Sequence, residues 1–142
     1  MLNCSLWNGA TCEMLGGKFS ADETWKALLR TEDDPDRNSI FMAVPTVYNN
    51  LATHFKNGKV GTDPAEVKEI LSRFRLMVSG SAALPVTQME EWKDISGQQL
   101  LERFGMTEIL MALSNPYRPI EDRLKGCVGK PLPGVSAALL SL

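Results

Sequence analysis

Apolar and polar positions alternate along the chain in blocks that predict buried strands separated by amphipathic helices. Nearly continuous apolar runs, typical of strands in a parallel sheet, lie at 39–44, 75–78 and 99–104. Residues 10–15 and 135–142 also have the composition of strands. With helical patterns between the runs, this order predicts an α/β fold with a largely parallel sheet and flanking helices.

Capping residues and prolines mark where the helices begin and end. Ser20 and Glu23 form a capping box that begins a helix to about Arg30. Three more helices are predicted by Pro45 at a first helical position, Asp63 as an N-cap and Pro85 at the start. The last of them ends at Gly97. The segments 31–38, 114–123 and 126–134 are rich in charge, proline or glycine and predict loops.

Composition narrows the possible classes of protein. The 142 residues are 44% hydrophobic and 23% charged, which is ordinary for one globular domain. Fifteen basic and seventeen acidic residues are mixed along the chain, so no nucleic-acid-binding face is predicted. No apolar run approaches the roughly 20 residues needed to cross a bilayer. Three cysteines and the single histidine, His54, argue against a disulfide framework, a zinc site and a histidine-based triad.

A loop of small residues follows the second apolar run, Ser79-Gly80-Ser81-Ala82-Ala83. Small side chains let a flat ligand approach the backbone, whose N–H and C=O groups can read the edge of a base. The following helix begins near Pro85, and its N-terminal dipole favours an anion. A tight strand-to-helix turn without any ligand explains this loop better when it is taken alone, because such turns are common.

The segment from Leu101 to Glu108 carries more specific chemistry. Phe104 can stack on a base, and Gly105 permits close approach of another group. The Thr107 hydroxyl can donate to a phosphate oxygen, and the Glu108 carboxylate is a hard ligand suited to Mg²⁺. The alternative is a helix start with Thr107 as N-cap. Because ligands sit beyond the carboxyl ends of parallel strands, this segment and the small-residue loop are expected to share one crevice.

Three cationic side chains lie beside the predicted strands: Arg75, Arg103 and Lys130. They could pair with an anionic substrate, although lone charges in such places are more often solvated or structural ion pairs. Met106 and Leu110 are predicted to be pocket wall or core.

Four motifs in order resemble the adenylate-forming acyl-CoA synthetases. They are Phe41–Tyr48, Met77–Pro85, Leu101–Glu108 and Gly126–Val135. The pair Ser-Gly-Ser-Ala-Ala-Leu-Pro and Glu-Arg-Phe-Gly-Met-Thr-Glu is similar to the malonyl-CoA and methylmalonyl-CoA synthetase branch, which is mitochondrial in animals. The resemblance covers essentially the whole chain. It implies an enzyme that activates a small carboxylate with ATP, giving an acyl-adenylate and pyrophosphate, after which coenzyme A displaces AMP.

The resemblance also implies roles for individual residues. The residues that would bind the nucleotide are Gly80, Ser81, Ala82, Phe104, Gly105 and Thr107. Phe104 would stack on adenine, Thr107 would contact the α-phosphate and Glu108 would ligate Mg²⁺, which makes Thr107 and Glu108 the catalytic candidates. The residues expected near the acyl pocket are Ser81, Met106, Arg75 and Arg103. A dicarboxylate needs a cationic or hydroxyl partner there, which either arginine could supply.

Several parts of the family's site are not found in these residues. They are the phosphate loop with its lysine, the Thr-Gly-Asp segment expected just beyond Leu142, and the C-terminal small domain with the catalytic lysine. We therefore expect residues 1–142 to be a fragment of the large AMP-binding domain. Electrostatic stabilisation of the transferred phosphate is the main catalytic effect in such chemistry, so little or no activity is expected from the fragment itself.

The sequence leaves alternatives for the cellular location, the substrate and the function of the chain. Mitochondrial location follows from the resemblance, and cytoplasmic location is the alternative because no targeting segment is visible. The substrate could instead be a fatty or another short-chain acid. The chain could also be a non-catalytic nucleotide-binding or interaction module, or a poorly folding product with open sheet edges.

Overall fold

Three parallel strands form the centre of the fold, and each arises from one of the apolar runs. The computed structural model describes residues 2–140. β1 (Ile40–Ala43) pairs in parallel with β2 (Leu76–Ser79), and β2 pairs in parallel with β3 (Leu101–Met106). The α/β class is therefore confirmed.

Two antiparallel strands extend this sheet on the side of β3. The chain reverses after Met106 into β4 (Leu110–Ser114), and the two-residue β5 (Lys130–Pro131) pairs with β4. The strand order is β1-β2-β3-β4-β5, with β1 at one edge. Neither antiparallel strand was predicted, because the turn before β4 resembles a helix start and β5 lies in a segment rich in glycine and proline.

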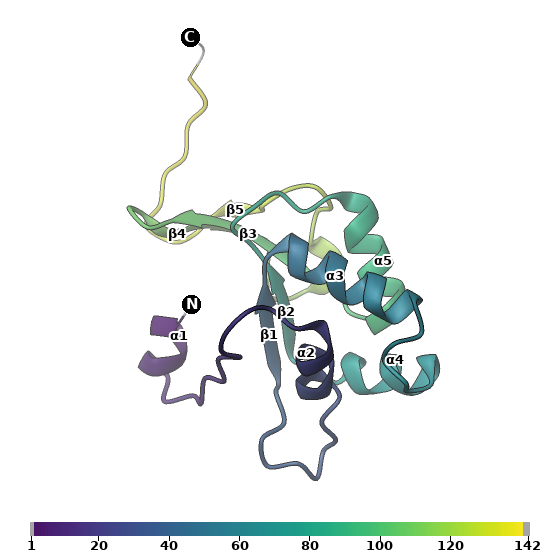
Figure 1. Cartoon of the computed structure of the whole chain (residues 1–142). Helices are drawn as coiled ribbons and strands as arrows, with labels where there is room; N and C mark the ends of the chain where they lie inside the picture. The colour runs from purple at the N-terminus through teal and green to yellow at the C-terminus, as the bar shows by residue number, and fades with distance from the viewer. Residues whose placement is uncertain (1, 141–142) are drawn as a thin grey trace.

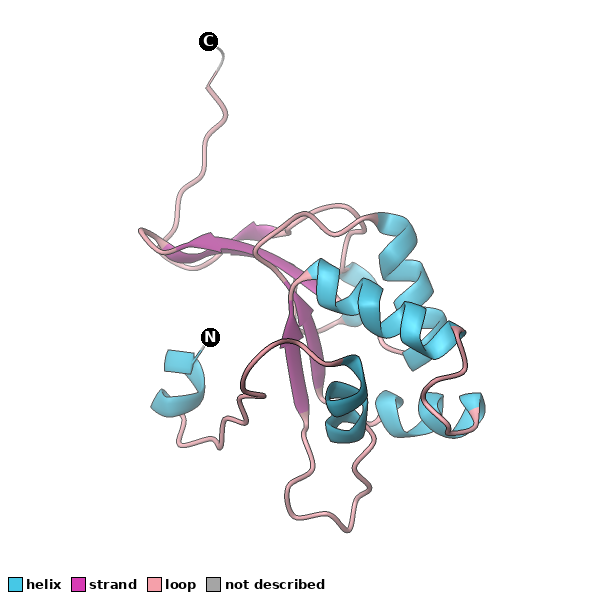
Figure 2. Ribbon diagram, viewed as in Figure 1, coloured by secondary structure: helices cyan, strands magenta, loops and turns pink. Residues whose placement is uncertain are grey.

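Four helices cover one face of the sheet, as Figures 1 and 2 show. They are α2 (Ala21–Leu28), α3 (Pro45–Lys56), α4 (Pro64–Ser72) and α5 (Val86–Ser96). The short α1 (Leu2–Trp7), which was not predicted, lies on the other side of β1 in Figure 1. A 3₁₀ turn, η1 (Ile120–Asp122), interrupts the predicted loop after β4. None of the helices in the described part of the chain is long and apolar enough to span a membrane.

The predicted caps begin and end these helices. The Ser20 hydroxyl accepts from the Glu23 N–H at 3.3 Å. The Asp63 carboxylate accepts from the Ala65 N–H at 2.9 Å. Gly97 ends α5 in the left-handed conformation, with φ +71°. The predicted boundaries differ by one or two residues, since α2 ends at Leu28 and Pro85 is an N-cap.

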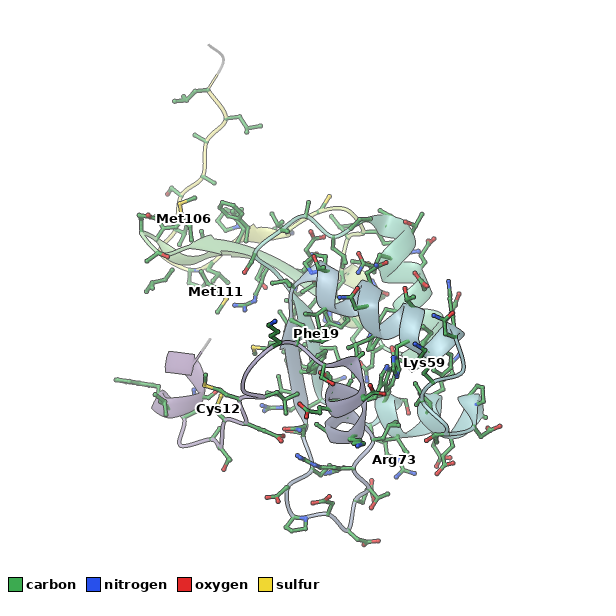
Figure 3. All side chains as sticks on the ribbon, viewed as in Figure 1. Cys12, Phe19, Lys59, Arg73, Met106 and Met111 are labelled. Carbon is green, nitrogen blue, oxygen red and sulfur yellow. The ribbon has the colours of Figure 1, made fainter. Side chains whose placement is uncertain are left out.

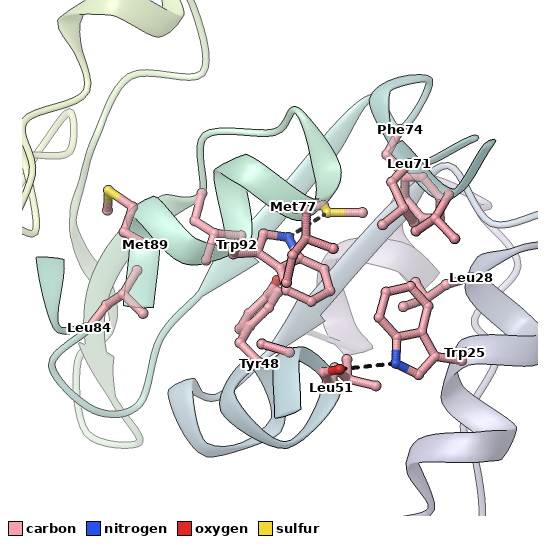
Figure 4. Close-up of a cluster of buried hydrophobic side chains, with 14 residues drawn as sticks. Trp25, Leu28, Tyr48, Leu51, Leu71, Phe74, Met77, Leu84, Met89 and Trp92 are labelled. Atoms are coloured by element: carbon pink, nitrogen blue, oxygen red, sulfur yellow. Dashed lines mark hydrogen bonds between the residues drawn. The ribbon is translucent and has the colours of Figure 1, made fainter. Parts of the chain in front are cut away.

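Aromatic side chains from three helices meet between the helices and the sheet (Figure 4). Trp92 of α5 lies against Trp25 of α2 at a ring-centroid distance of 5.9 Å. It meets Tyr48 of α3 edge-on at 4.9 Å. The indole N–H groups are satisfied: Trp25 donates to the Leu51 carbonyl at 3.2 Å, and Trp92 to the Met77 sulfur at 3.3 Å. This cluster fixes the helices against β1 and β2.

Three strand predictions need correction. Residues 10–15 are exposed and form no strand; Glu13 is held instead by Arg30 at 2.7 Å. β1 is half-buried at every position rather than buried on both faces, because it is an edge strand with helices on one face. Residues 135–140 are assigned to no strand and run away from the sheet in Figure 1. Residues 141–142 lie outside the described residues.

Candidate functional site

The small-residue loop begins where β2 ends and is anchored at both of its ends. Ser79 is fully buried in the sheet, and the Leu84 side chain is buried in the core. The Leu84 N–H donates to the Glu102 Oε1 at 2.9 Å. Between these anchors Ser81, Ala82 and Ala83 are exposed. The small side chains of the loop are thus exposed, while the residues at its two ends are buried and fixed.

Gly80 and Arg103 lie against each other at the carboxyl end of β2. A Cβ added at Gly80 would lie 3.5 Å from both the Arg103 Cγ and the Arg103 carbonyl oxygen. The Arg103 guanidinium also contacts the Met111 sulfur of β4. The structure therefore brings the small-residue loop next to the strand that carries Phe104, as the parallel sheet predicted.

A tight hairpin carries the second predicted motif. Thr107, Glu108 and Ile109 form its exposed turn, with the Ile109 N–H donating to the Met106 carbonyl at 3.3 Å. The alternative of a helix beginning at Thr107 is therefore wrong. A Cβ at Gly105 would lie only 2.1 Å from the Leu110 carbonyl oxygen, so the close approach of the two strands requires glycine.

A groove lies beside Phe104, between the hairpin and the segment after β5. It has a volume of about 440 Å³ and is mainly apolar. Its lining residues are Phe104, Ile109, Ala112, Leu113 and Gly134–Ala137. Phe104 is 39% exposed, so one aromatic surface is available to a ligand. The size falls within the range of small-molecule sites, roughly 300–1,000 Å³.

The predicted residues are only partly brought together. Gly80, Ser81 and Ala82 do not line this groove. β3 pairs with Ser79 at Glu102 and continues for four more residues, to Met106. At about 3.3 Å per residue, the end of β3 lies roughly 13 Å beyond the start of the small-residue loop. Figure 3 shows Met106 at the outer end of the hairpin.

The two arginines have different positions relative to these loops. Arg103 adjoins Gly80. Arg75 precedes the amino end of β2, the opposite end from the small-residue loop, and its side chain is exposed. Its N–H donates to the Ser39 carbonyl at 2.8 Å. Only Arg103 is therefore near the other candidate residues. Lys130 lies exposed in β5.

Unusual backbone conformations occur in both candidate loops. Among residues 2–140, Ser81 with φ +67° and Leu110 with φ +57° are the two non-glycine residues in the left-handed region. Such residues cost roughly 1–3 kcal/mol and cluster at functional sites. This observation is independent of the motifs and points to the same two segments.

The loop from β4 to β5 is held by buried polar side chains that sequence analysis missed. Asn115 donates through Nδ2 to the Glu102 carbonyl at 3.2 Å and the Cys127 carbonyl at 2.5 Å. The Arg123 guanidinium donates to carbonyls, including that of Tyr117 at 2.8 Å, and its burial lowers its pKa. These contacts fix the loop that precedes β5, and the groove-lining residues 134–137 follow β5 along the chain.

Glu102 was also missed, although the sequence contains a signal for it. It is a charged residue beside Leu100 and Leu101 in an apolar run, and it is only 2% exposed. A carboxylate buried in this way needs hydrogen-bond donors. In contrast, no group of three or more His, Cys, Asp or Glu side chains that could hold a metal is present among the described residues.

Comparison with known proteins identifies related sequences along the chain. The sequence profile of the family described as "AMP-binding enzyme" matches residues 1–141. The mitochondrial malonate–CoA ligase ACSF3 of Mus musculus is 49% identical over 145 residues, covering 99% of this chain and 24% of that protein. The chain thus spans about a quarter of the length of the curated relatives it matches.

The chain is also similar to solved structures of malonyl-CoA ligases. The ATP-bound MatB from Rhodopseudomonas palustris is 36% identical, with a TM-score of 0.73 over 94% of this chain and 23% of that one. A malonyl-CoA ligase in a ternary product complex with methylmalonyl-CoA and AMP is 35% identical, with a TM-score of 0.64 over 82% of this chain and 22% of that one.

Proposed function

The chain belongs to the AMP-binding enzyme family, and on that premise we propose that it forms part of an ATP-dependent malonyl-CoA or methylmalonyl-CoA synthetase. In the proposed reaction the substrate carboxylate attacks the α-phosphorus of ATP and releases pyrophosphate. The thiol of coenzyme A then attacks the acyl-adenylate carbonyl and releases AMP. The names of the relatives and their bound nucleotides support this assignment.

The observation that carries the proposal is the position of Phe104. Its partly exposed ring lines a groove of about 440 Å³, and Thr107 and Glu108 lie in the turn of the same β3–β4 hairpin. Stacking of a base on an aromatic ring contributes roughly 1–3 kcal/mol. Gly80, Ser81 and Ala82 are proposed to line the adenine side, with Gly105 beside the base.

Thr107 and Glu108 are proposed to act on the phosphates. The Thr107 hydroxyl would donate to an α-phosphate oxygen, and the Glu108 carboxylate would hold Mg²⁺. The donor set fits this ion, since Mg²⁺ is usually bound by one or two carboxylates together with phosphate oxygens and water. Both side chains are exposed at the hairpin turn and can approach a nucleotide. When bound, Mg²⁺ neutralises charge on the phosphates.

For the acyl substrate, the geometry favours one of the two predicted arginines. Arg103 lies against Gly80, so we propose it as the cationic partner of the second carboxylate, with Ser81 on the adjoining loop. Met106 is proposed to contribute to the acyl pocket from the outer end of the hairpin. Arg75 was predicted for the same role, but its position at the opposite end of β2 does not support it.

We further propose that residues 1–142 are a segment of the large AMP-binding domain, without the C-terminal small domain. The match over about a quarter of each relative supports this division. Mitochondrial location is proposed because the relatives' names include it. Coenzyme A, ATP and a small carboxylate would be the partners of the complete enzyme.

Thioester formation tests the proposed function. The complete product of the reading frame that encodes this chain is assayed with ATP, Mg²⁺ and coenzyme A, using malonate, methylmalonate or acetate. We expect a higher kcat/KM for a dicarboxylate. Glu108→Gln should lower kcat/KM by about a hundredfold, because Mg²⁺ on the phosphates would lose its charged carboxylate ligand.

A matched substitution controls for loss of surface charge. Glu121→Gln changes an exposed glutamate in η1 and should leave kcat/KM unaltered. A clear preference for acetate would reject the dicarboxylate assignment, and equal activity of Glu108→Gln and the wild type would reject the role of Glu108.

A further inference from the structure

Glu102 occupies an unusual position for a carboxylate. It is the second residue of β3 and is 2% exposed. Its backbone carbonyl accepts from the Asn115 N–H at 3.1 Å and from the Asn115 Nδ2 at 3.2 Å. Its Oε1 accepts from the Leu84 N–H at 2.9 Å. One residue therefore joins β3 to both the small-residue loop and the loop after β4.

The same residue fixes both ends of the small-residue loop. Ser79, where the loop begins, is the register partner of Glu102 in the parallel β2–β3 pair. Leu84, where the loop ends, is bound by the Glu102 side chain. Four residues, 80–83, lie between these two attachments. The spacing between the ends of the loop is thus set by one residue on the neighbouring strand, through its backbone at Ser79 and its side chain at Leu84.

The backbone of this loop needs such an attachment. Ser81 is held in the left-handed conformation, with φ +67°, which an unrestrained serine rarely adopts. Leu84 provides the buried anchor that lets surrounding structure enforce this conformation. If the Leu84 N–H lost its acceptor, the residues from Gly80 to Ala83 would be free to relax.

We propose that Glu102 is a positioning residue that holds loop 80–83 in its binding conformation next to β3, the strand that carries Phe104. The inference rests on the proposed nucleotide site, because the loop is expected to line the adenine side. Glu102 acts through the Leu84 N–H and need not contact the nucleotide. Since Phe104 follows two residues later on β3, one strand places both the loop and the aromatic ring.

Two substitutions separate the hydrogen bond from the charge. Glu102→Gln keeps an oxygen that can accept from the Leu84 N–H, whereas Glu102→Leu has a similar size and no acceptor. In the complete enzyme we expect Glu102→Leu to raise the KM for ATP by about tenfold with a small change in kcat, the factor that corresponds to one hydrogen bond. Glu102→Gln should restore a KM close to that of the wild type.

Amide hydrogen exchange at Leu84 reads the attachment directly and needs no activity. Exchange at this amide should become faster in Glu102→Leu and remain slow in Glu102→Gln. Ser96→Ala serves as the control for general destabilisation. Ser96 is another fully buried polar residue, and its hydroxyl bonds to the Trp92 carbonyl at 2.6 Å at the far end of α5. This variant should alter neither the KM for ATP nor Leu84 exchange.

Each contrary result has a separate meaning. If Glu102→Gln raises KM as much as Glu102→Leu, the negative charge itself contacts the ligand and the positioning role is overturned. Unchanged KM and unchanged Leu84 exchange in Glu102→Leu also overturn it. If the wild-type enzyme forms no thioester from any acid, the proposed function fails, while Leu84 exchange still decides whether Glu102 anchors the loop.

Discussion

Tyr48 places a hydroxyl in the middle of the apolar core. Its ring is fully buried, and its hydroxyl donates to the Val78 carbonyl at 2.9 Å, linking α3 to β2. Burial raises the pKa of the Tyr48 phenol above its usual range, and the hydrogen bond to Val78 only partly opposes that effect. The phenol therefore remains neutral in the folded protein well above pH 10, whereas in the unfolded chain it ionises near pH 10.

This difference predicts how stability falls in alkali. A raised pKa in the folded state contributes stability that is fully present below about pH 10 and is lost as pH rises above that value. The free energy of unfolding should decrease by about 1.4 kcal/mol per pH unit from this group alone. Urea unfolding at intervals from pH 8 to 11 measures the slope.

Tyr48→Phe is the matched comparison for this titration. It should be less stable than the wild type by about 1 kcal/mol at pH 8, because the Val78 carbonyl loses a donor. Its stability should also fall less steeply above pH 10. Parallel slopes for the two proteins would contradict the assignment of the effect to Tyr48.

At the scale of elements, the β3–β4 hairpin shows what sequence reasoning could and could not predict. Its candidate site residues, Phe104, Thr107 and Glu108, were proposed from their types and order and stay a prediction. Its antiparallel return was not, because a Thr-Glu pair begins helices as readily as it fills a turn. What distinguishes the two is the close approach of Gly105 to Leu110, a tertiary contact between strands.

The helices and central strands were easier to predict. Ser20, Asp63 and Gly97 act locally through caps, so their neighbours in sequence contain the signal. β5, in contrast, pairs with β4 over only two residues, and nothing in its composition indicates a strand. The groove was not predictable either, since its walls are separated by more than twenty residues of chain.

Gly105→Ala tests the importance of the hairpin contact. The new Cβ would meet the Leu110 carbonyl oxygen at 2.1 Å, so the two strands must separate. We expect a loss of about 3 kcal/mol in the free energy of unfolding and faster amide exchange in β4. Chemical unfolding and amide exchange measure the two effects.

Gly80→Ala provides the matched control for stability. Its Cβ would lie at an ordinary contact distance of 3.5 Å from Arg103, and its backbone is not in the left-handed region. The expected change in unfolding free energy is therefore below about 1 kcal/mol. Similar losses of unfolding free energy in the two variants would show that the close approach of Gly105 to Leu110 does not require glycine.

At the scale of the whole molecule, one aromatic cluster unites the helices that cover the sheet. Trp92 of α5 contacts Trp25 of α2 and Tyr48 of α3, and its indole N–H bonds to Met77 of β2 (Figure 4). The two candidate loops lie outside this cluster, in exposed parts of the chain. Replacing the exposed side chains of Thr107 and Glu108 should therefore have little effect on stability.

Trp92→Ala should destabilise the whole fold. Removing a fully buried indole leaves a large cavity, and the expected cost is about 3–5 kcal/mol. Trp7→Ala removes the same side chain from a position that is 90% exposed, so its unfolding midpoint should match the wild type. Thermal unfolding of the two variants makes the comparison. Equal midpoints would contradict the central role of Trp92 in the core.

In the β3–β4 hairpin, Phe104 pairs with Leu113 and Gly105 pairs with Met111, so the pairing register shifts by one residue between them. This shift has a consequence for how the sequence can change in length. Before the shift, β3 is paired with β2, and adding one residue would turn every following side chain to the other face. Beyond the shift, β3 is paired with β4 alone. A bulge there already accommodates one extra residue on β4. Insertions and deletions among homologues should therefore collect in the outer hairpin, while the spacing from Leu101 to Phe104 within β3 stays constant.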